Sequence, residues 1–205
     1  MGAGKGYLTF ALYDHLANTM KLKAEVIGVE FRPELVALGN AIAKESDFTG
    51  LRFVEGSIAD YNCAGTDVVI ALHACDTATD DALFKAIEAQ SGLIVVAPCC
   101  HKQVRREMVI SPSHPLYFML QYGTYVERMA EMLTDSLRAH LLQFCGYTTN
   151  VFEFISDAHT PKNVMIVASR ARGGDNSKTL ATIEHIKASF AIKTQKLAKL
   201  LGLES

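Results

Sequence analysis

Short apolar runs alternate with amphipathic stretches along the first half of the chain. Strands are predicted at the apolar runs, over residues 25–30 (EVIGVE), 51–54, 67–72 (DVVIAL) and 93–97 (LIVVA). Helices are predicted between them, over residues 8–20, from Pro33 along Leu35, Leu38 and Ile42, and from Asp76 or Thr77 to Gly92. Because strands that are apolar on both faces need cover on two sides, the pattern predicts an α/β fold with a mostly parallel, twisted sheet between helices.

The second half of the chain has a different pattern. Residues 99–115 are irregular in pattern and basic, and the capping-box spacing of Thr124 and Glu127 then predicts the start of a long helix. Beyond that helix, residues 148–155 and 163–169 are predicted as strands. Their short joint leaves no room for a crossover helix, so the two strands should form an antiparallel pair.

The C-terminal region is predicted to be separate from the folded domain. Gly173 and Gly174 form a linker, and residues 177–201 are expected to form one amphipathic helix. We therefore expect a domain over residues 1–172, followed by a linker and helix over residues 173–205.

Composition and charge narrow the class of protein. With 205 residues, of which 49% are apolar and 20% charged, the chain fits one ordinary globular domain. A net charge of -2 gives no general attraction to nucleic acid, so any polyanion must bind a local basic patch. No apolar run approaches the roughly 18 residues of a membrane span, and the first residues lack the apolar core of a signal peptide. We therefore expect a cytoplasmic protein that does not bind membranes.

A glycine-rich turn opens the chain, and an acidic residue ends the first predicted strand. Gly2, Gly4 and Gly6 have the spacing Gly-x-Gly-x-Gly, and Glu30 closes the EVIGVE run. Glycines let the backbone approach a ligand, helix N-terminal amides favour an anionic group, and a carboxylate at this strand end accepts ribose hydroxyls. A P-loop is excluded because Gly-Lys-Gly-Tyr replaces Gly-Lys-Ser/Thr, and a nicotinamide site is disfavoured because position 7 is Tyr.

Two further motifs follow later strands. They are His73-Ala74-Cys75-Asp76, after residues 67–72, and Pro98-Cys99-Cys100-His101-Lys102, after residues 93–97. Together with the glycine motif and the antiparallel pair, they make residues 2–172 similar to class I S-adenosylmethionine-dependent methyltransferases, in particular to the methyltransferase-like group with His-x-Cys and Pro-Cys-Cys motifs. The chain also resembles the tRNA ribose methylases that have a Cys-Cys-His-His signature.

The resemblance implies a Rossmann-like fold, a seven-stranded sheet whose last strand is antiparallel, and S-adenosylmethionine as the cofactor. By resemblance, Gly2, Gly4 and Gly6 line the methionine end of the cofactor, Glu30 holds the ribose, Ser57 and Ile58 border the adenine, and Leu72 and His73 lie beneath the sulfonium. Ala3, Tyr7 and Phe31 are further candidate cofactor-binding residues. Members of the family have a strand before the glycine motif. Because this chain starts inside that motif, we expect a fragment that lacks the first strand, with Met1 internal to a longer protein.

The residues after the third and fourth predicted strands are candidates for the chemistry. Methyl transfer from a sulfonium depends mainly on alignment, and a nearby base helps a hydroxyl or amine acceptor. His73, Asp76 and His101 are candidates for that base. Lys102 is a candidate for orienting a phosphate or carboxylate of the substrate.

Cysteines near the same strand ends allow three interpretations. The odd total of five argues against a disulfide framework. Cys75, Cys99 and Cys100, with the neighbouring histidines, have ligand chemistry for zinc, although no Cys-x-x-Cys pair is present. Alternatively, Cys99 or Cys100 attacks a pyrimidine ring covalently, or both are small packing residues. We retain Cys99 and Cys100 among the candidate catalytic residues and predict no metal, and we expect Cys63 and Cys145 to be packing residues.

The sequence therefore predicts an S-adenosylmethionine-dependent methyltransferase. The resemblance and the basic residues Lys102, Arg105 and Arg106 favour RNA, either tRNA or rRNA, as the substrate. A small molecule or a protein side chain is the alternative substrate, and a non-catalytic Rossmann-like binding module is the alternative function. The intact glycine motif and Glu30 favour the enzyme, because a module without catalysis needs neither.

Overall fold

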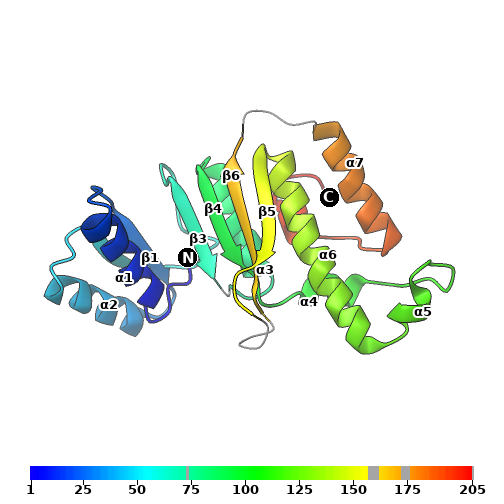
Figure 1. Cartoon of the computed structure of the whole chain (residues 1–205), viewed down its shortest axis with the longest axis horizontal. Helices are drawn as coiled ribbons and strands as arrows, with labels where there is room; N and C mark the ends of the chain where they lie inside the picture. Colours follow the sequence, from blue (N-terminus) through cyan, green and yellow to red (C-terminus); the bar gives the residue numbers. More distant parts are fainter. Residues whose placement is uncertain (73, 157–161, 172–175, 205) are drawn as a thin grey trace. The chain divides into compact units, whose positions relative to one another are not determined.

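The computed structural model describes residues 1–72, 74–156, 162–171 and 176–204 (Figure 1). The chain folds as two compact units, Met1–Asn62 and Cys63–Ser205. Each unit combines helices with a small sheet, which confirms the α/β class predicted from the sequence. The predicted linker at Gly173 and Gly174 lies outside the described residues.

The first unit is built around two parallel strands. Its elements are helix α1 (Tyr7–Asp14), the π-helical turn η1 (His15–Thr19), strand β1 (Val26–Glu30), helix α2 (Pro33–Glu45) and strand β2 (Leu51–Glu55). The register of β1 and β2 sets Glu30 opposite Glu55 at the carboxyl ends of both strands. Pro33 occupies the first position of α2, as predicted, where a missing N–H leaves no intrahelical bond unmade.

The ring of Phe53 fills the centre of this unit, and glycines make room for it. A Cβ atom would lie 2.5 Å from the ring at Gly28 and 2.7 Å from it at Gly39 and Gly6. Asn40 on α2 fastens the same strand, since its amide both donates to the Phe53 carbonyl oxygen and accepts from the Phe53 N–H at 2.8 Å. These contacts hold α2 against β2 and seat the end of the glycine turn on the core.

The second unit contains a four-stranded mixed sheet. Its strands are β3 (Val68–Leu72), β4 (Leu93–Ala97), β5 (Tyr147–Glu153) and β6 (Val164–Arg170), in the order β3-β4-β6-β5. Strands β3 and β4 are parallel, whereas β6 is antiparallel to both of its neighbours. The predicted antiparallel pair and the antiparallel last strand are therefore confirmed. In the described residues the chain has six strands in two sheets, where the resemblance implied one sheet of seven.

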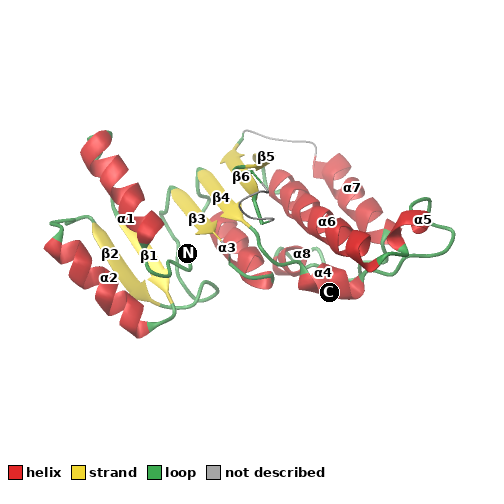
Figure 2. Ribbon diagram, turned by 60° about the horizontal axis from the view of Figure 1, so that its bottom comes forward, coloured by secondary structure: helices red, strands yellow, loops and turns green. Residues whose placement is uncertain are grey.

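In the described part of the second unit, six helices accompany this sheet. They are α3 (Thr77–Glu88), α4 (Lys102–Glu107), α5 (Tyr117–Leu120), α6 (Gly123–Phe144), α7 (Asn176–Ser189) and α8 (Lys196–Leu200). Helix α3 packs on β3 and β4, and α6 packs on β5 and β6 (Figure 2). Helix α7 packs on α6, and α8 packs on α3. Among the described helices, none is both long enough and apolar enough to cross a bilayer.

Several local predictions are wrong. The segment predicted to be irregular contains helix α4. The predicted capping box of Thr124 and Glu127 is absent, because α6 begins at Gly123 and its N-cap makes no side-chain hydrogen bond. Helix α3 ends before the predicted Gly92, since Gln90 already takes the left-handed conformation at φ 56°.

The predicted C-terminal helix is two helices. Ala191 has φ 54°, which ends the path of α7, and the Gln195 side chain caps α8 by accepting from the Ala198 N–H at 2.8 Å. Between the two helices, the Glu107 carboxylate accepts from the Lys193 and Thr194 amides at 2.8 and 2.7 Å. The helix breaks because these contacts tie the intervening segment to the end of α4.

Candidate functional site

The glycine turn lies against the carboxyl end of β1. Gly2, Gly4 and Gly6 have φ 67°, 57° and 79°, the left-handed conformation in which a residue with a Cβ atom is strained. The Ala3 N–H donates to the Val29 carbonyl oxygen at 2.8 Å, which fixes the turn to the strand. Helix α1 then begins without a side-chain cap, so its first amides present the positive end of the helix.

Glu30 points toward this turn. Its Oε2 accepts from the Gly4 amide at 2.7 Å, and its Oε1 accepts from the Arg32 Nε at 2.7 Å and the Arg32 amide at 3.2 Å. The residue is only 6% exposed. Hydrogen bonding to the Arg32 side chain, aided by the two amides, holds the pKa of Glu30 below its usual value despite burial. Glu30 is therefore a buried carboxylate that stays charged at neutral pH.

Space remains beside the backbone of the turn. A Cβ atom at Gly4 would meet nothing within 4 Å, and one at Gly2 would meet only the Cδ1 of Ile58, at 3.8 Å. The first unit therefore brings together an open backbone turn, an uncapped helix terminus and a charged carboxylate at the carboxyl end of β1.

The other residues predicted to bind the cofactor take different places. Tyr7 and Phe31 are 78% and 74% exposed. The Ser57 hydroxyl donates to the Asp60 carboxylate at 2.6 Å, next to Ile58. Leu72 is the last residue of β3 and so belongs to the second unit.

A hollow of about 470 Å³ in the first unit lies away from the glycine turn. It is lined by residues such as Glu25, Gly50 and Arg52, at the amino ends of β1 and β2. Ligands of parallel α/β sheets gather at the carboxyl ends of the strands, so we assign no cofactor to this hollow.

Three cysteines meet in the second unit. The Cys99 Sγ lies 3.7 Å from the Cys75 Sγ and 3.8 Å from the Cys100 Sγ. Burial, and then the two neighbouring thiols, raise the pKa of Cys99 to about 12. Cys99 is therefore a thiol at neutral pH, which disfavours its action as a covalent nucleophile. Cys63 is buried, in keeping with the packing role predicted for it.

Asp76 connects the loops after β3 and β4. It has φ 50° and ψ -117°, an unusual conformation for a residue with a side chain. Its Oδ1 accepts from the backbone N–H of Gln103 at 3.3 Å, and its carbonyl oxygen accepts from the Arg138 Nη2 at 2.8 Å. His73, predicted to follow β3 in the same loop, lies outside the described residues.

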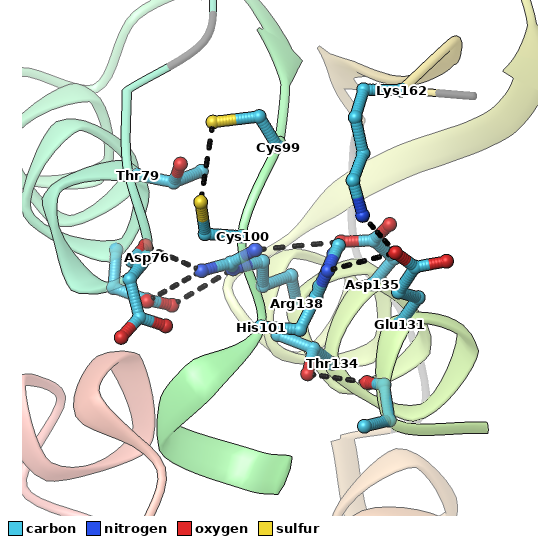
Figure 3. A network of polar contacts seen from close by, with 12 residues as sticks. Asp76, Thr79, Cys99, Cys100, His101, Glu131, Thr134, Asp135, Arg138 and Lys162 are labelled. Carbon is cyan, nitrogen blue, oxygen red and sulfur yellow. Dashed lines mark hydrogen bonds and ion pairs between the residues drawn. The ribbon is translucent and has the colours of Figure 1, made fainter. Parts of the chain in front are cut away.

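His101 is buried among acidic residues of α6 (Figure 3). Its Nε2 lies 3.3 Å from the Asp135 Oδ1, and its Nδ1 lies 4.0 Å from the Glu131 Oε1. Glu131 also forms an ion pair with Lys162, near the start of β6. Because both ring nitrogens face carboxylates and the residue is only 5% exposed, His101 is poorly placed to meet a substrate.

Arg138 is the centre of the same network and is fully buried. Its Nη2 and Nε bind the Asp80 carboxylate at 2.7 and 3.1 Å, and its Nη1 lies 3.4 Å from Asp135. Burial alone would lower the pKa of Arg138, but the carboxylates of Asp80 and Asp135 raise it above its usual value. Gln195 completes the network by donating to Asp80 at 2.7 Å.

The predicted basic residues lie on α4. Lys102 and Arg106 are exposed, whereas Arg105 pairs with Glu127 on α6 at 3.3 Å. Two residues that sequence reasoning missed are Arg32 and Arg138. The spacing of Arg32 two residues after Glu30 was a usable signal, whereas no local pattern marks the partner of Arg138.

Comparison with known proteins gives one family. The profile of a family described as "Methyltransferase domain" matches residues 1–107, just over half of the chain. No curated protein matches.

Solved structures extend the comparison to the fold. The methyltransferase domain of bacterial CtHen1-C has a TM-score of 0.52 at 15% identity, over 83% of this chain and 87% of that one. Precorrin-6y C5,15-methyltransferase from Geobacter metallireducens GS-15 has a TM-score of 0.46 at 12% identity, over 83% of this chain and 77% of that one. The first of these similarities confirms a Rossmann-like fold.

Proposed function

This chain belongs to the methyltransferase-domain family, and from that premise we propose that its glycine turn and Glu30 bind S-adenosylmethionine. Membership makes the protein a methyltransferase rather than a non-catalytic binding module. The observation that carries the proposal is the 2.7 Å hydrogen bond from the Gly4 amide to the Glu30 carboxylate. It joins a charged carboxylate to a turn whose backbone is open to a ligand.

The residues present fit both ends of this cofactor. A strand-end carboxylate can accept a ribose hydroxyl. Glu30 accepts from the Gly4 amide, the Arg32 amide and the Arg32 Nε, so about one of the roughly four lone pairs of the carboxylate remains for the ribose. The uncapped N-terminus of α1 favours the carboxylate of the methionine part. When bound, the cofactor supplies a methyl group on a positively charged sulfur.

Alignment is the main contribution that we assign to the protein. The sulfonium is already a good leaving group, so the displacement depends on holding donor and acceptor in line. Glu30 would hold the nucleoside end, and the start of α1 would hold the amino-acid end. These two contacts, one at the end of β1 and one at the start of α1, would thereby orient the methyl group.

Calorimetric titration with S-adenosylmethionine tests this assignment. We expect Glu30→Gln to weaken binding by about 10- to 100-fold, because a hydrogen bond to a charged group contributes about 1.5–3 kcal/mol. Glu55→Gln is the matched control, since Glu55 is exposed and lies opposite Glu30 on β2. Unchanged affinity in Glu30→Gln would contradict the proposed ribose contact.

RNA is the methyl acceptor that we propose. Support comes from the exposed side chains of Lys102 and Arg106 on α4, which follows the carboxyl end of β4, because cationic groups there can bind phosphates.

The purified chain would be given methyl-labelled cofactor with RNA, protein and small-molecule fractions from cells that lack the gene. We expect label in RNA, and strong loss of it in Lys102→Glu/Arg106→Glu. Label in protein or small molecules alone would replace the substrate and keep the enzyme class.

A further inference from the structure

The spacing of three sulfur atoms in the second unit matches a metal site. The Sγ of Cys99 lies 3.7 Å from that of Cys75 and 3.8 Å from that of Cys100, and all three lie within 4.8 Å of one another. A tetrahedral zinc ion with Zn–S bonds of about 2.3 Å separates its sulfur ligands by about 3.8 Å. We propose that Cys75, Cys99 and Cys100 bind a zinc ion through three thiolates.

The backbone around these cysteines is held in place by contacts that reach both loops. Cys75 follows β3, and Cys99 and Cys100 follow β4, and these two strands are parallel neighbours that end in register. The backbone N–H of Gln103 on α4 donates to the Asp76 carboxylate, and the buried Arg138 donates to the Asp76 carbonyl oxygen. The ligands are therefore brought together before any metal binds, which lowers the entropy lost on binding.

The exposure of the cysteines suits a metal site, in which the bound cation replaces the thiol protons. Cys75 is exposed and Cys99 and Cys100 are half-buried, so an ion can reach all three from solvent. Cys75 directly precedes Asp76, the N-cap residue of α3. Binding of zinc would release three protons, one from each thiol, and would leave the complex with a single negative charge.

The ligand set selects the metal and leaves one position open. Thiolates disfavour Mg²⁺ and Ca²⁺, which take oxygen ligands, and the common iron–sulfur clusters are held by four cysteines. Among the described residues, no histidine, cysteine or acidic side chain joins the three cysteines as a fourth ligand. Three protein ligands with a fourth position for water or a substrate atom is the pattern of catalytic zinc. The site would thus correct the expectation that the chain holds no metal.

Cobalt and zinc binding to the full chain tests the inference. The reduced, metal-free protein would be titrated with Co²⁺, and then with Zn²⁺ in competition with a coloured chelator, in the absence of S-adenosylmethionine. For the wild-type chain we expect one ion per chain and sulfur-to-cobalt charge-transfer absorption. In Cys75→Ser and in Cys99→Ser we expect zinc affinity to fall by more than about 100-fold, since even changes outside the ligand shell cost about 10- to 100-fold. Cys145→Ser, which changes a half-buried cysteine outside the group, should bind zinc normally.

Three results would overturn the proposal. They are no thiolate–cobalt absorption, wild-type zinc affinity in Cys75→Ser, and equal loss of affinity in Cys145→Ser. Circular dichroism checks that each variant is folded, and if Cys99→Ser is not, Cys75→Ser decides alone because its side chain is exposed. These measurements do not involve methyl transfer, so they succeed or fail independently of the proposed function.

Discussion

Arg32 shows how one exposed side chain governs a buried one. Its guanidinium binds the Glu30 Oε1 at 2.7 Å, and this hydrogen bond is the main reason that the pKa of Glu30 lies below its usual value. The charge on Glu30 is in turn the property on which ribose binding depends. The sequence motif identified the acid but not the base that keeps it ionised.

Replacing Arg32 should therefore change the titration of Glu30. We expect Arg32→Ala to raise the pKa of Glu30, and ¹³C NMR of the side-chain carboxyl would measure the shift. The sign for stability follows from the lowered pKa in the folded state. The contribution of Glu30 is present above its unfolded-state pKa and is lost as the pH falls through the folded-state value, so it should be lost at higher pH in Arg32→Ala. Arg52→Ala, which breaks the exposed pair with Glu25, should leave Glu30 unchanged.

Helices α3 and α6 are joined by a buried ion pair. Arg138 on α6 and Asp80 on α3 are each about 1% exposed, and Arg138 also reaches the loop that holds Asp76. Removing one partner of such a pair leaves the other charge buried and uncompensated. The pair therefore makes the packing of these two helices depend on a single side chain.

We expect Arg138→Met to reduce the free energy of unfolding by about 3–5 kcal/mol in urea denaturation followed by circular dichroism. The double variant Asp80→Leu/Arg138→Met should recover part of this loss, because it removes both charges. Arg128→Met, which breaks an exposed pair with Glu131, should cost no more than about 1 kcal/mol. An Arg138→Met variant as stable as Arg128→Met would show that the pair does not bind the helices together.

Local patterns predicted the elements better than their ends and partners. The apolar run LIVVA gave β4 at its observed bounds, because continuous apolar residues have one stable place in a parallel sheet. The ends of α3 and α6 were missed because Gln90 and Gly123 carry no strong capping signal. The contact of Arg138 with Asp80 was beyond sequence reasoning, since only packing of the two helices brings those residues together. The cysteine cluster was foreseeable as an option once adjacent parallel strands were expected.

At the scale of the whole molecule, a net charge of -2 makes any RNA contact local. If Lys102 and Arg106 bind phosphates, removing both should reduce the slope of log affinity against log salt by about 1.4 for single-stranded RNA. Fluorescence anisotropy with labelled RNA across a salt series would measure the slope for Lys102→Ala/Arg106→Ala. The matched double variant Lys44→Ala/Lys199→Ala removes two exposed lysines from other helices and should keep the wild-type slope. Equal slopes in the two double variants would remove α4 from the interface.

The position of β6 in its sheet has a consequence for synthesis on the ribosome. In the part of the chain that the structure describes, β5 pairs only with β6, and β6 alone connects it to β4. As the nascent chain emerges, β5 leaves the exit tunnel before its partner exists, with its backbone donors and acceptors unpaired. The sheet can be completed only after Arg170 has followed, because β6 supplies the pairing for both β4 and β5. Until then the gap beside β4 is an open edge to which another nascent chain could add a strand.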